Sequence, residues 1–340
     1  FLSGFVLVPL LGIRTVVITV AVIIALLSLL IRGGKRALSG VLSVIFVIFF
    51  AVEIGPAMGL YALQNENVVY ETDSMYSHIT VEDRESGERV LLMDGLIHNM
   101  YDPENPDRLL YEYERIFRSA TDSYLERRRG GGSFRTLTLG GGALTFPSYL
   151  ERHYPESENH VVEIDPEVVE IAYRYFDIPR DTDMQIHVAD ARQYVRTAMG
   201  EEEFDLIYLD VFDSYSVPWH LTTREFAQEM KKLLAEDGMI LVNLIDIFTI
   251  GKFLGAYSKT LGEVFDDVRL YTSGDFNRDL RSTFVLLAGR ELISEKSLRS
   301  RDGVEFTRIR QEEMRELRDR NNSPLLTDNY VPVENLIAPV

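Results

Sequence analysis

The sequence contains no cysteine, and this absence removes several classes of chemistry. A disulfide framework, a thiolate nucleophile and a cysteine-based zinc site are all excluded. The six histidines show no H-E-x-x-H spacing, and the chain has neither a P-loop nor a G-x-S-x-G motif. We therefore expect no metal site, no P-loop nucleotide chemistry and no serine hydrolysis.

Basic residues are also scarce, because 35 Lys and Arg stand against 53 Asp and Glu, for a formal net charge of −18. A phosphate backbone is repelled by such a surface, so we expect no nucleic-acid partner. Residues 1–64 carry +3, which leaves −21 for the rest of the chain. This acidity favours a cationic substrate such as a polyamine, although it also fits solubility or a salt-adapted or heat-adapted host.

Two long apolar runs lie near the start of the chain. Residues 15–31 are uncharged over 17 positions, and residues 37–52 form a second such run. Each approaches the ~20 residues that cross a bilayer. The chain starts on Phe, so we expect residues 1–64 to be the C-terminal part of a membrane domain. Buried helices of a soluble protein are the alternative interpretation.

The orientation of these spans is ambiguous from the sequence. The loop "RGGKR" at 32–36 is basic and is expected on the cytoplasmic side, which would place the following domain outside. The cofactor inferred below is an intracellular metabolite. We therefore predict an inner or plasma membrane protein whose catalytic domain is cytoplasmic.

After residue 64 the pattern changes to strands and amphipathic helices. Residues 65–105 are predicted to be a small β-rich lead-in. Residues 106–292 alternate apolar strands with helices, which is typical of a parallel sheet covered on both faces. This predicts an α/β, Rossmann-like domain with an antiparallel pair at its edge, formed by 267–273 and 282–289. Residues 293–340 are predicted to form a charged surface helix and a tail.

Ligand-binding chemistry is concentrated at the ends of four predicted strands. Gly140, Gly141 and Gly142 follow the first of these strands, in "LTLGGGALTF". Three carboxylate segments end the strands that follow: Glu163, then Asp190, then Asp210 with Asp213. Any one of them alone is more often a helix cap or a surface carboxylate. Together they predict a nucleoside site at the carboxyl ends of the strands. NAD fits the same fold type, but "VADAR" favours an S-adenosyl ligand.

These segments resemble the spermidine synthase family of polyamine aminopropyltransferases over roughly residues 65–289. The resemblance is carried by "LTLGGGALTF", "VVEIDPEVVEIAYRYF", "HVADARQYV" and "FDLIYLDVFDS". The segments "SVPWHLTTREF" and "LLTDNYVPVENL", together with the apolar runs, are similar to its membrane-fused branch. The resemblance implies a Rossmann-like S-adenosylmethionine-dependent transferase fold.

The resemblance also implies roles for the residues that contact the donor. The glycine loop 140–142 would approach the nucleoside, Glu163 would bind the ribose, and Asp190 with Ala191 would bind the adenine. His98 would lie near the thioether.

The resemblance gives the catalytic roles to acidic and aromatic residues. Asp210 would be the catalytic carboxylate, which accepts the proton of the attacking amine as a general base. Asp213 would be the second acid of a gating loop. Tyr113 would be the substrate tyrosine, with Tyr111 as the alternative register.

The sequence departs from the family pattern at Ala143, where the family loop usually carries an aspartate that binds the amino end of decarboxylated S-adenosylmethionine. We expect a membrane-anchored transferase that moves an aminopropyl or related alkyl group to a small-molecule polyamine. The donor is decarboxylated S-adenosylmethionine or S-adenosylmethionine, without a metal, and family analogy suggests a homodimer. The alternatives are a methyltransferase acting on a membrane-associated or small acceptor, and a non-catalytic sensor that binds polyamine or nucleoside.

Overall fold

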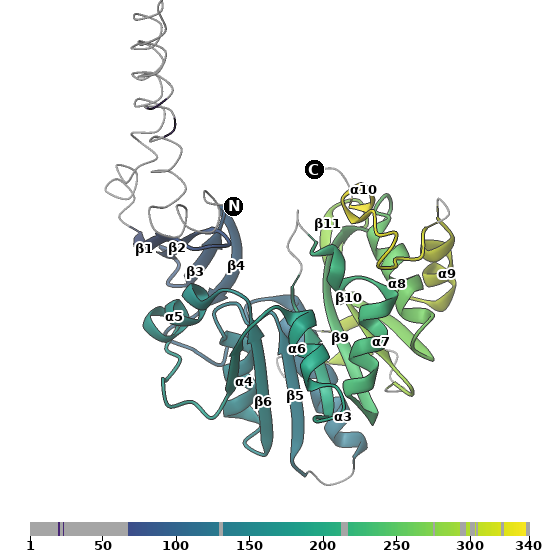
Figure 1. Cartoon of the computed structure of the whole chain (residues 1–340), viewed down its shortest axis with the longest axis horizontal. Helices are drawn as coiled ribbons and strands as arrows, with labels where there is room; N and C mark the ends of the chain where they lie inside the picture. Colours follow the sequence, from purple (N-terminus) through teal and green to yellow (C-terminus); the bar gives the residue numbers. More distant parts are fainter. Residues whose placement is uncertain are drawn as a thin grey trace, which may run out of the picture. The chain divides into compact units, whose positions relative to one another are not determined.

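The computed structural model divides the chain into two compact units, Phe1–Met100 and Tyr101–Val340, which we describe separately (Figure 1). The structure describes residues 20, 23, 67–128, 132–211, 217–274, 276–292, 297–299, 303, 305–320 and 323–337. The apolar runs at 15–31 and 37–52 lie outside these residues, except for Val20 and Ile23. Among the residues that are described, no helix has the length and apolarity needed to cross a bilayer. The predicted spans therefore stay a prediction.

A four-stranded antiparallel sheet forms the described part of the first unit, in the order β1-β2-β3-β4. Its strands are β1 (Val68–Asp73), β2 (His78–Asp83), β3 (Arg89–Met93) and β4 (Leu96–Tyr101). Ile79 and Val81 of β2 are fully buried, as alternation along a half-buried strand requires. Asp94 and Gly95 both have positive φ, at 51° and 80°, which suits the tight turn that joins β3 to β4.

The second unit is built on a nine-stranded sheet in the order β12-β13-β10-β11-β9-β8-β5-β6-β7. The strands on its parallel side are β5 (Phe134–Leu139), β6 (Ser157–Glu163), β7 (Gln185–Val188), β8 (Phe204–Leu209) and β9 (Leu234–Ile247). The chain runs outward from β5 through β6 to β7, and then returns to place β8 on the other side of β5. Strand order thus reverses at β5, and ligands bind at such a point.

Helices cover both faces of this sheet, which confirms the predicted α/β fold. They are α3 (Glu112–Arg127), α4 (Thr145–His153), α5 (Pro166–Tyr175), α6 (Ala191–Ala198), the 3-10 turn η3 (Trp219–Leu221), α7 (Arg224–Leu233), α8 (Phe253–Gly262), α9 (Gln311–Asp319) and α10 (Val333–Leu336). Along β8, Ile207 and Leu209 belong to the core that includes α6, α7 and α8. Leu206 and Tyr208 alternate with them and belong to the core that includes α3 and α4.

The antiparallel side of the sheet differs from the sequence prediction. The predicted pair is present as β10 (Asp267–Ser273) and β11 (Arg281–Gly289). It does not form the edge, because β12 (Ser297–Arg299) and β13 (Glu305–Arg308) extend the sheet beyond β10. Leu298 and Phe306 are fully buried, and this burial holds a charge-rich segment in the sheet that was predicted to be helical. The helix of this region, α9, begins only at Gln311.

Candidate functional site

The four predicted ligand positions lie together at the carboxyl ends of neighbouring strands. Gly140 directly follows β5, Glu163 ends β6, Asp190 follows β7 and Asp210 directly follows β8. Backbone hydrogen bonds join the loops: the Gly140 N–H donates to Val162 O at 2.9 Å, and the Asp210 N–H donates to Leu139 O at 2.9 Å. The structure therefore places these positions at the point where strand order reverses.

The glycine loop is packed too tightly for any side chain at its first position. A Cβ on Gly140 would lie 2.1 Å from the Asp210 carbonyl oxygen, and its φ of +88° also favours glycine. At Gly141 a Cβ would lie 2.9 Å from Cγ1 of Val161. The two glycines thus allow the loop to lie directly against β6 and the end of β8.

Glu163 is held beneath this loop by backbone amides. Its Oε2 accepts the N–H groups of Gly141 and Gly142, each at 3.0 Å, and its Oε1 accepts the Asp165 N–H at 3.0 Å. Burial raises the pKa of Glu163, while these donors act in the opposite direction. A carboxylate has about four lone-pair sites. One remains available for a ligand hydroxyl beside the glycine loop.

Exposed apolar side chains adjoin the carboxylates of this edge. Ile164 is 40% exposed directly after Glu163, and Val188 is 54% exposed at the end of β7. Binding pockets combine apolar surface with a few placed polar groups, so these two side chains suit the face of a flat ring. Sequence reasoning missed them because it weighed only the polar residues at the strand ends.

Asp190 caps a helix and pairs with a histidine. Its Oδ1 accepts the Gln193 N–H at 2.9 Å at the start of α6, and its Oδ2 lies 3.0 Å from Nε2 of His220. Burial acts to raise the pKa of Asp190, but the Gln193 amide and His220 outweigh it and leave the pKa lowered. Ala191 is the buried first residue of α6. The cap and the nucleoside prediction are compatible, because a carboxylate has about four lone-pair sites and the Gln193 amide, the Arg192 amide and His220 account for three.

Asp210 sits between a tyrosine and an asparagine. Tyr113 of α3 donates its hydroxyl to Oδ2 at 2.7 Å, and Asn243 of β9 donates Nδ2 to Oδ1 at 2.9 Å. Burial, followed by the charge of Asp210, raises the pKa of Tyr113 well above its usual range. The phenol therefore stays a donor that fixes the carboxylate. Tyr111 instead packs against Tyr113, with ring centroids 5.5 Å apart, so the geometry favours the Tyr113 register.

Sequence reasoning missed Asn243, although its signal was present. It is a polar residue inside the apolar stretch "GMILVNLI", and it is only 4% exposed. Its Oδ1 is buried without a hydrogen-bond partner. A buried amide oxygen of this kind normally finds a donor. Beside Asp210, a bound amine is a suitable one.

Glu114 is a further buried carboxyl group near Asp210. It is 2% exposed, and its Oε2 accepts the Tyr111 N–H at 3.3 Å. Burial, and then the charge of Asp210, raise the pKa of Glu114 to about 8. At neutral pH its neutral form is therefore favoured. No local sequence pattern indicates this group, because its environment depends on packing between α3 and the sheet.

We expect Glu114 to make folding stability depend on pH. Because its folded pKa of about 8 exceeds the usual glutamate pKa of 4.5, unfolding between these pH values releases a proton. Stability should therefore fall as pH rises through that window, by at most about 1.4 kcal/mol per pH unit. Denaturant titrations from pH 5 to pH 9 should show this slope in the wild type and not in Glu114→Gln. The exposed neighbour Glu112, changed to Gln, should keep the wild-type slope, and parallel curves for all three chains would refute the assignment.

Two predicted site residues are not placed by this geometry. Asp213 lies within 212–216, outside the described residues. His98 belongs to β4 of the first unit. Their roles stay predictions. In the described part of the chain, no group of three or more His, Asp or Glu is arranged to hold a metal ion.

Comparison with known proteins identifies the family. The profile of the spermine/spermidine synthase domain matches residues 69–273. This chain belongs to the spermine/spermidine synthase family. It is 30% identical over 218 residues to a polyamine aminopropyltransferase of Vibrio vulnificus, an alignment covering 61% of this chain and 68% of that protein. It is 25% identical over 321 residues to a probable polyamine aminopropyl transferase of Bifidobacterium longum, covering 89% and 69% of the two chains.

The fold is shared with a solved member of the family. A probable spermidine synthase from Corynebacterium glutamicum superposes with a TM-score of 0.66 at 23% identity, over 79% of this chain and 99% of that one. Family membership indicates that the chain is a transferase.

Proposed function

We propose that this chain transfers an aminopropyl group from decarboxylated S-adenosylmethionine to a small polyamine. The observation that carries the proposal is the position of Asp210, fixed by Tyr113 and Asn243 at the end of β8 beside the glycine loop. A carboxylate held in this way can accept a proton from an amine whose reference pKa is near ~10.4. The amine nitrogen then bonds to the donor carbon, the carbon–sulfur bond breaks, and methylthioadenosine leaves as a neutral thioether.

The donor would be held by the neighbouring strand ends. The remaining lone pair of Glu163 suits a ribose hydroxyl, and the carboxylate of Asp190 suits the exocyclic amino group of adenine. Ile164 and Val188 supply apolar surface for the purine. Alignment of the donor carbon with the amine would then supply much of the rate enhancement.

The acceptor would be a polycation. Residues 65–340 carry a net charge of −21, which attracts such a substrate and raises its rate of encounter. The names of the two curated relatives both describe aminopropyl transfer to polyamines.

We also propose that residues 1–64 attach the enzyme to a membrane with the catalytic unit in the cytoplasm. The location of a reporter fused after Val340 tests this topology. Sedimentation of the full chain tests the homodimer.

Methyl transfer from S-adenosylmethionine is the second candidate, and Ala143 favours it. This position offers no carboxylate for the cationic amino end of the decarboxylated donor. Calorimetry with both donors and with methylthioadenosine tests the shared site, and the absence of binding by all three would refute either function. Product analysis separates them, because aminopropyl transfer yields methylthioadenosine and methyl transfer yields S-adenosylhomocysteine.

We expect Ala143→Asp to destabilise the protein and to make it responsive to the decarboxylated donor. Ala143 has no exposed surface, so the new carboxylate would be buried without a partner. The free energy of unfolding should fall by about 3 kcal/mol. If the donor's amine reaches this position, the decarboxylated donor should restore more thermal stability to Ala143→Asp than to its neutral isostere, Ala143→Asn. Equal restoration would show that Ala143 does not face that end of the donor.

A further inference from the structure

Arg192 is a buried cation beside the predicted adenine carboxylate. It is the second residue of α6, two positions after Asp190, and it is only 6% exposed. A guanidinium has five N–H groups. Two donate to Glu229 of α7, at 2.8 and 3.3 Å, and two to Asp328 of the C-terminal segment 323–337, each at 2.8 Å. The fifth donates to the carbonyl oxygen of His220 at 3.1 Å.

The position of Arg192 in the first turn of α6 is electrostatically unfavourable, which points to a functional role. A positive charge in the first turn of a helix faces the positive end of the helix dipole and is unfavourable there. Residues that break a local rule often belong to functional or strained sites. Here two carboxylates offset the charge: they raise the pKa of Arg192 despite its burial, and Arg192 lowers the pKa of Asp328.

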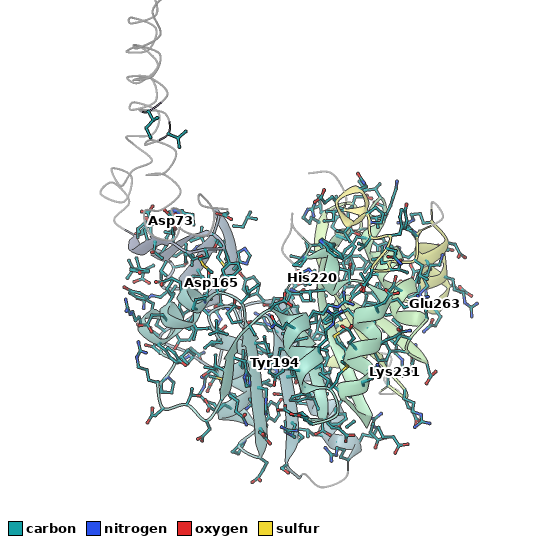
Figure 2. The ribbon with its side chains drawn as sticks, in the orientation of Figure 1. Asp73, Asp165, Tyr194, His220, Lys231 and Glu263 are labelled. Atoms are coloured by element: carbon teal, nitrogen blue, oxygen red, sulfur yellow. The ribbon has the colours of Figure 1, made fainter. Side chains whose placement is uncertain are left out.

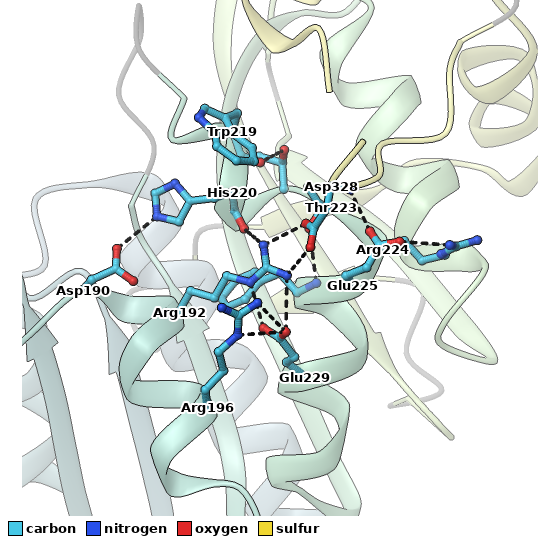
Figure 3. A network of polar contacts seen from close by, with 12 residues as sticks. Asp190, Arg192, Arg196, Trp219, His220, Thr223, Arg224, Glu225, Glu229 and Asp328 are labelled. Atoms are coloured by element: carbon cyan, nitrogen blue, oxygen red, sulfur yellow. Dashed lines mark hydrogen bonds and ion pairs between the residues drawn. The ribbon is translucent and has the colours of Figure 1, made fainter. Parts of the chain in front are cut away.

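Asp328 is in turn fastened to the beginning of α7 (Figure 3). Its Oδ1 accepts the Thr223 hydroxyl at 2.7 Å, and its N–H donates to Glu225 at 3.0 Å. The Arg224 N–H donates to Leu326 O at 2.8 Å. The segment 323–337 is thus tied both to α6 and to the residues that directly follow η3.

His220 connects this network to Asp190. It lies in η3, with its side chain 32% exposed, and it is labelled in Figure 2. Arg192 fixes its backbone carbonyl, and its Nε2 lies 3.0 Å from Oδ2 of Asp190. The Gln193 N–H occupies Oδ1. Backbone amides at the start of α6 and the His220 ring thus hold the Asp190 carboxylate, and the position of the ring depends on the Arg192 side chain.

We propose that Arg192 and Asp328 form a clamp that positions His220 on Asp190, so that the C-terminal segment completes the donor site. The inference rests on the proposed function in one respect, the binding of the donor's adenine at Asp190. Tyr113 and Asn243, which donate hydrogen bonds to Asp210, do not belong to the clamp. Loss of the clamp should weaken donor binding and leave the chemical step intact.

The test compares Asp328→Asn and His220→Ala with a matched control. Both positions are partly exposed, with side chains 36% and 32% accessible, so the variants are expected to fold. We expect the Kd for methylthioadenosine and the KM for the donor to rise about tenfold in each variant, with kcat at saturation within about twofold of wild type. Arg196→Gln is the control. Arg196 also binds Glu229, but its side chain is 53% exposed, and in the described part of the chain it acts on Asp328 only through its charge, without a hydrogen bond to it. Its Kd should be unchanged.

A second measurement needs no ligand and separates failure of the clamp from failure of the proposed function. Amide hydrogen exchange at residues 217–223 should be faster in Asp328→Asn than in wild type and Arg196→Gln, because the segment loses its attachment. Unchanged exchange would overturn the clamp. If exchange is faster in Asp328→Asn but the wild type binds no S-adenosyl compound, the proposed function fails. The clamp then only stabilises residues 217–223. If wild type binds the donor and the Kd of both variants stays within twofold, the role in donor binding is overturned.

Discussion

Replacing Asp210 with asparagine should lower kcat about 100-fold and leave donor affinity within about twofold of wild type. The amide has nearly the shape of the carboxylate, but it cannot accept a proton at neutral pH. Its oxygen can still accept from Asn243, and its NH2 group can donate to the Tyr113 oxygen, so the packing around the site is preserved. Donor contacts at Glu163 and Asp190 lie on other strands. The loss should therefore fall on the chemical step.

The same strand offers a matched control for this substitution. Asp205, near the amino end of β8, accepts the Tyr124 hydroxyl of α3 at 2.6 Å, much as Asp210 accepts that of Tyr113. It also pairs with Arg128 at 2.7 Å. Asp205→Asn should lower the melting temperature but not kcat, because it lies at the opposite end of the sheet from the site. Single-turnover rates and calorimetry on both variants provide the comparison.

Two outcomes would count against the role of Asp210. Turnover that is unchanged in Asp210→Asn would show that another group accepts the proton. Equal losses of kcat in Asp205→Asn and Asp210→Asn would show that the effect is structural. A wild-type chain that binds donor and polyamine but forms no product would support the non-catalytic sensor.

The sequence predicted those parts of the site that depend on local pattern. Strands that end in glycine or a carboxylate can be recognised in the sequence. A buried parallel strand is a run of apolar residues, and the ligand-binding residues follow at its carboxyl end. Gly140, Glu163, Asp190 and Asp210 could therefore be placed at strand ends from local pattern, while their roles rest on the family resemblance and stay predictions. Their convergence follows from the strand order β8-β5-β6-β7.

The remaining parts depend on contacts between distant segments. Arg192 and Asp328 are separated by 136 positions, and nothing local to either indicates the pairing. Glu114 reads as the polar face of a helix, and only packing shows that it is buried. Strand β13 was predicted as helix because its charges dominate the pattern, whereas the buried Phe306 and pairing with β10 decide its conformation. Tertiary context overrides local preference in such segments.

Glu163→Gln should weaken the binding of methylthioadenosine at least tenfold, which corresponds to about 1.4 kcal/mol. The carboxylate of Glu163 accepts three backbone N–H groups through its two oxygens. A glutamine has only one oxygen. If the glutamine oxygen stays beneath Gly141 and Gly142, the glutamine NH2 group faces the Asp165 N–H, and two donors oppose each other. If the amide is flipped instead, the N–H groups of both glycines lose their acceptor. A buried donor without an acceptor costs about 1–3 kcal/mol, so the loop should shift away from its ligand-binding position.

Methylthioadenosine is the right probe because it carries the adenosine moiety common to both candidate donors, so the result does not depend on which group is transferred. The control is Glu158→Gln near the amino end of the same strand, where the side chain is 46% exposed and pairs with Arg135 and His160. This position is remote from the glycine loop, so the Kd of Glu158→Gln should match wild type. If Glu163→Gln binds as tightly as Glu158→Gln, the carboxylate neither shapes the glycine loop nor contacts the ribose. If affinity falls in both variants, the effect comes from a general weakening of β6. Thermal melting of the two variants without ligand would then show equal losses of stability.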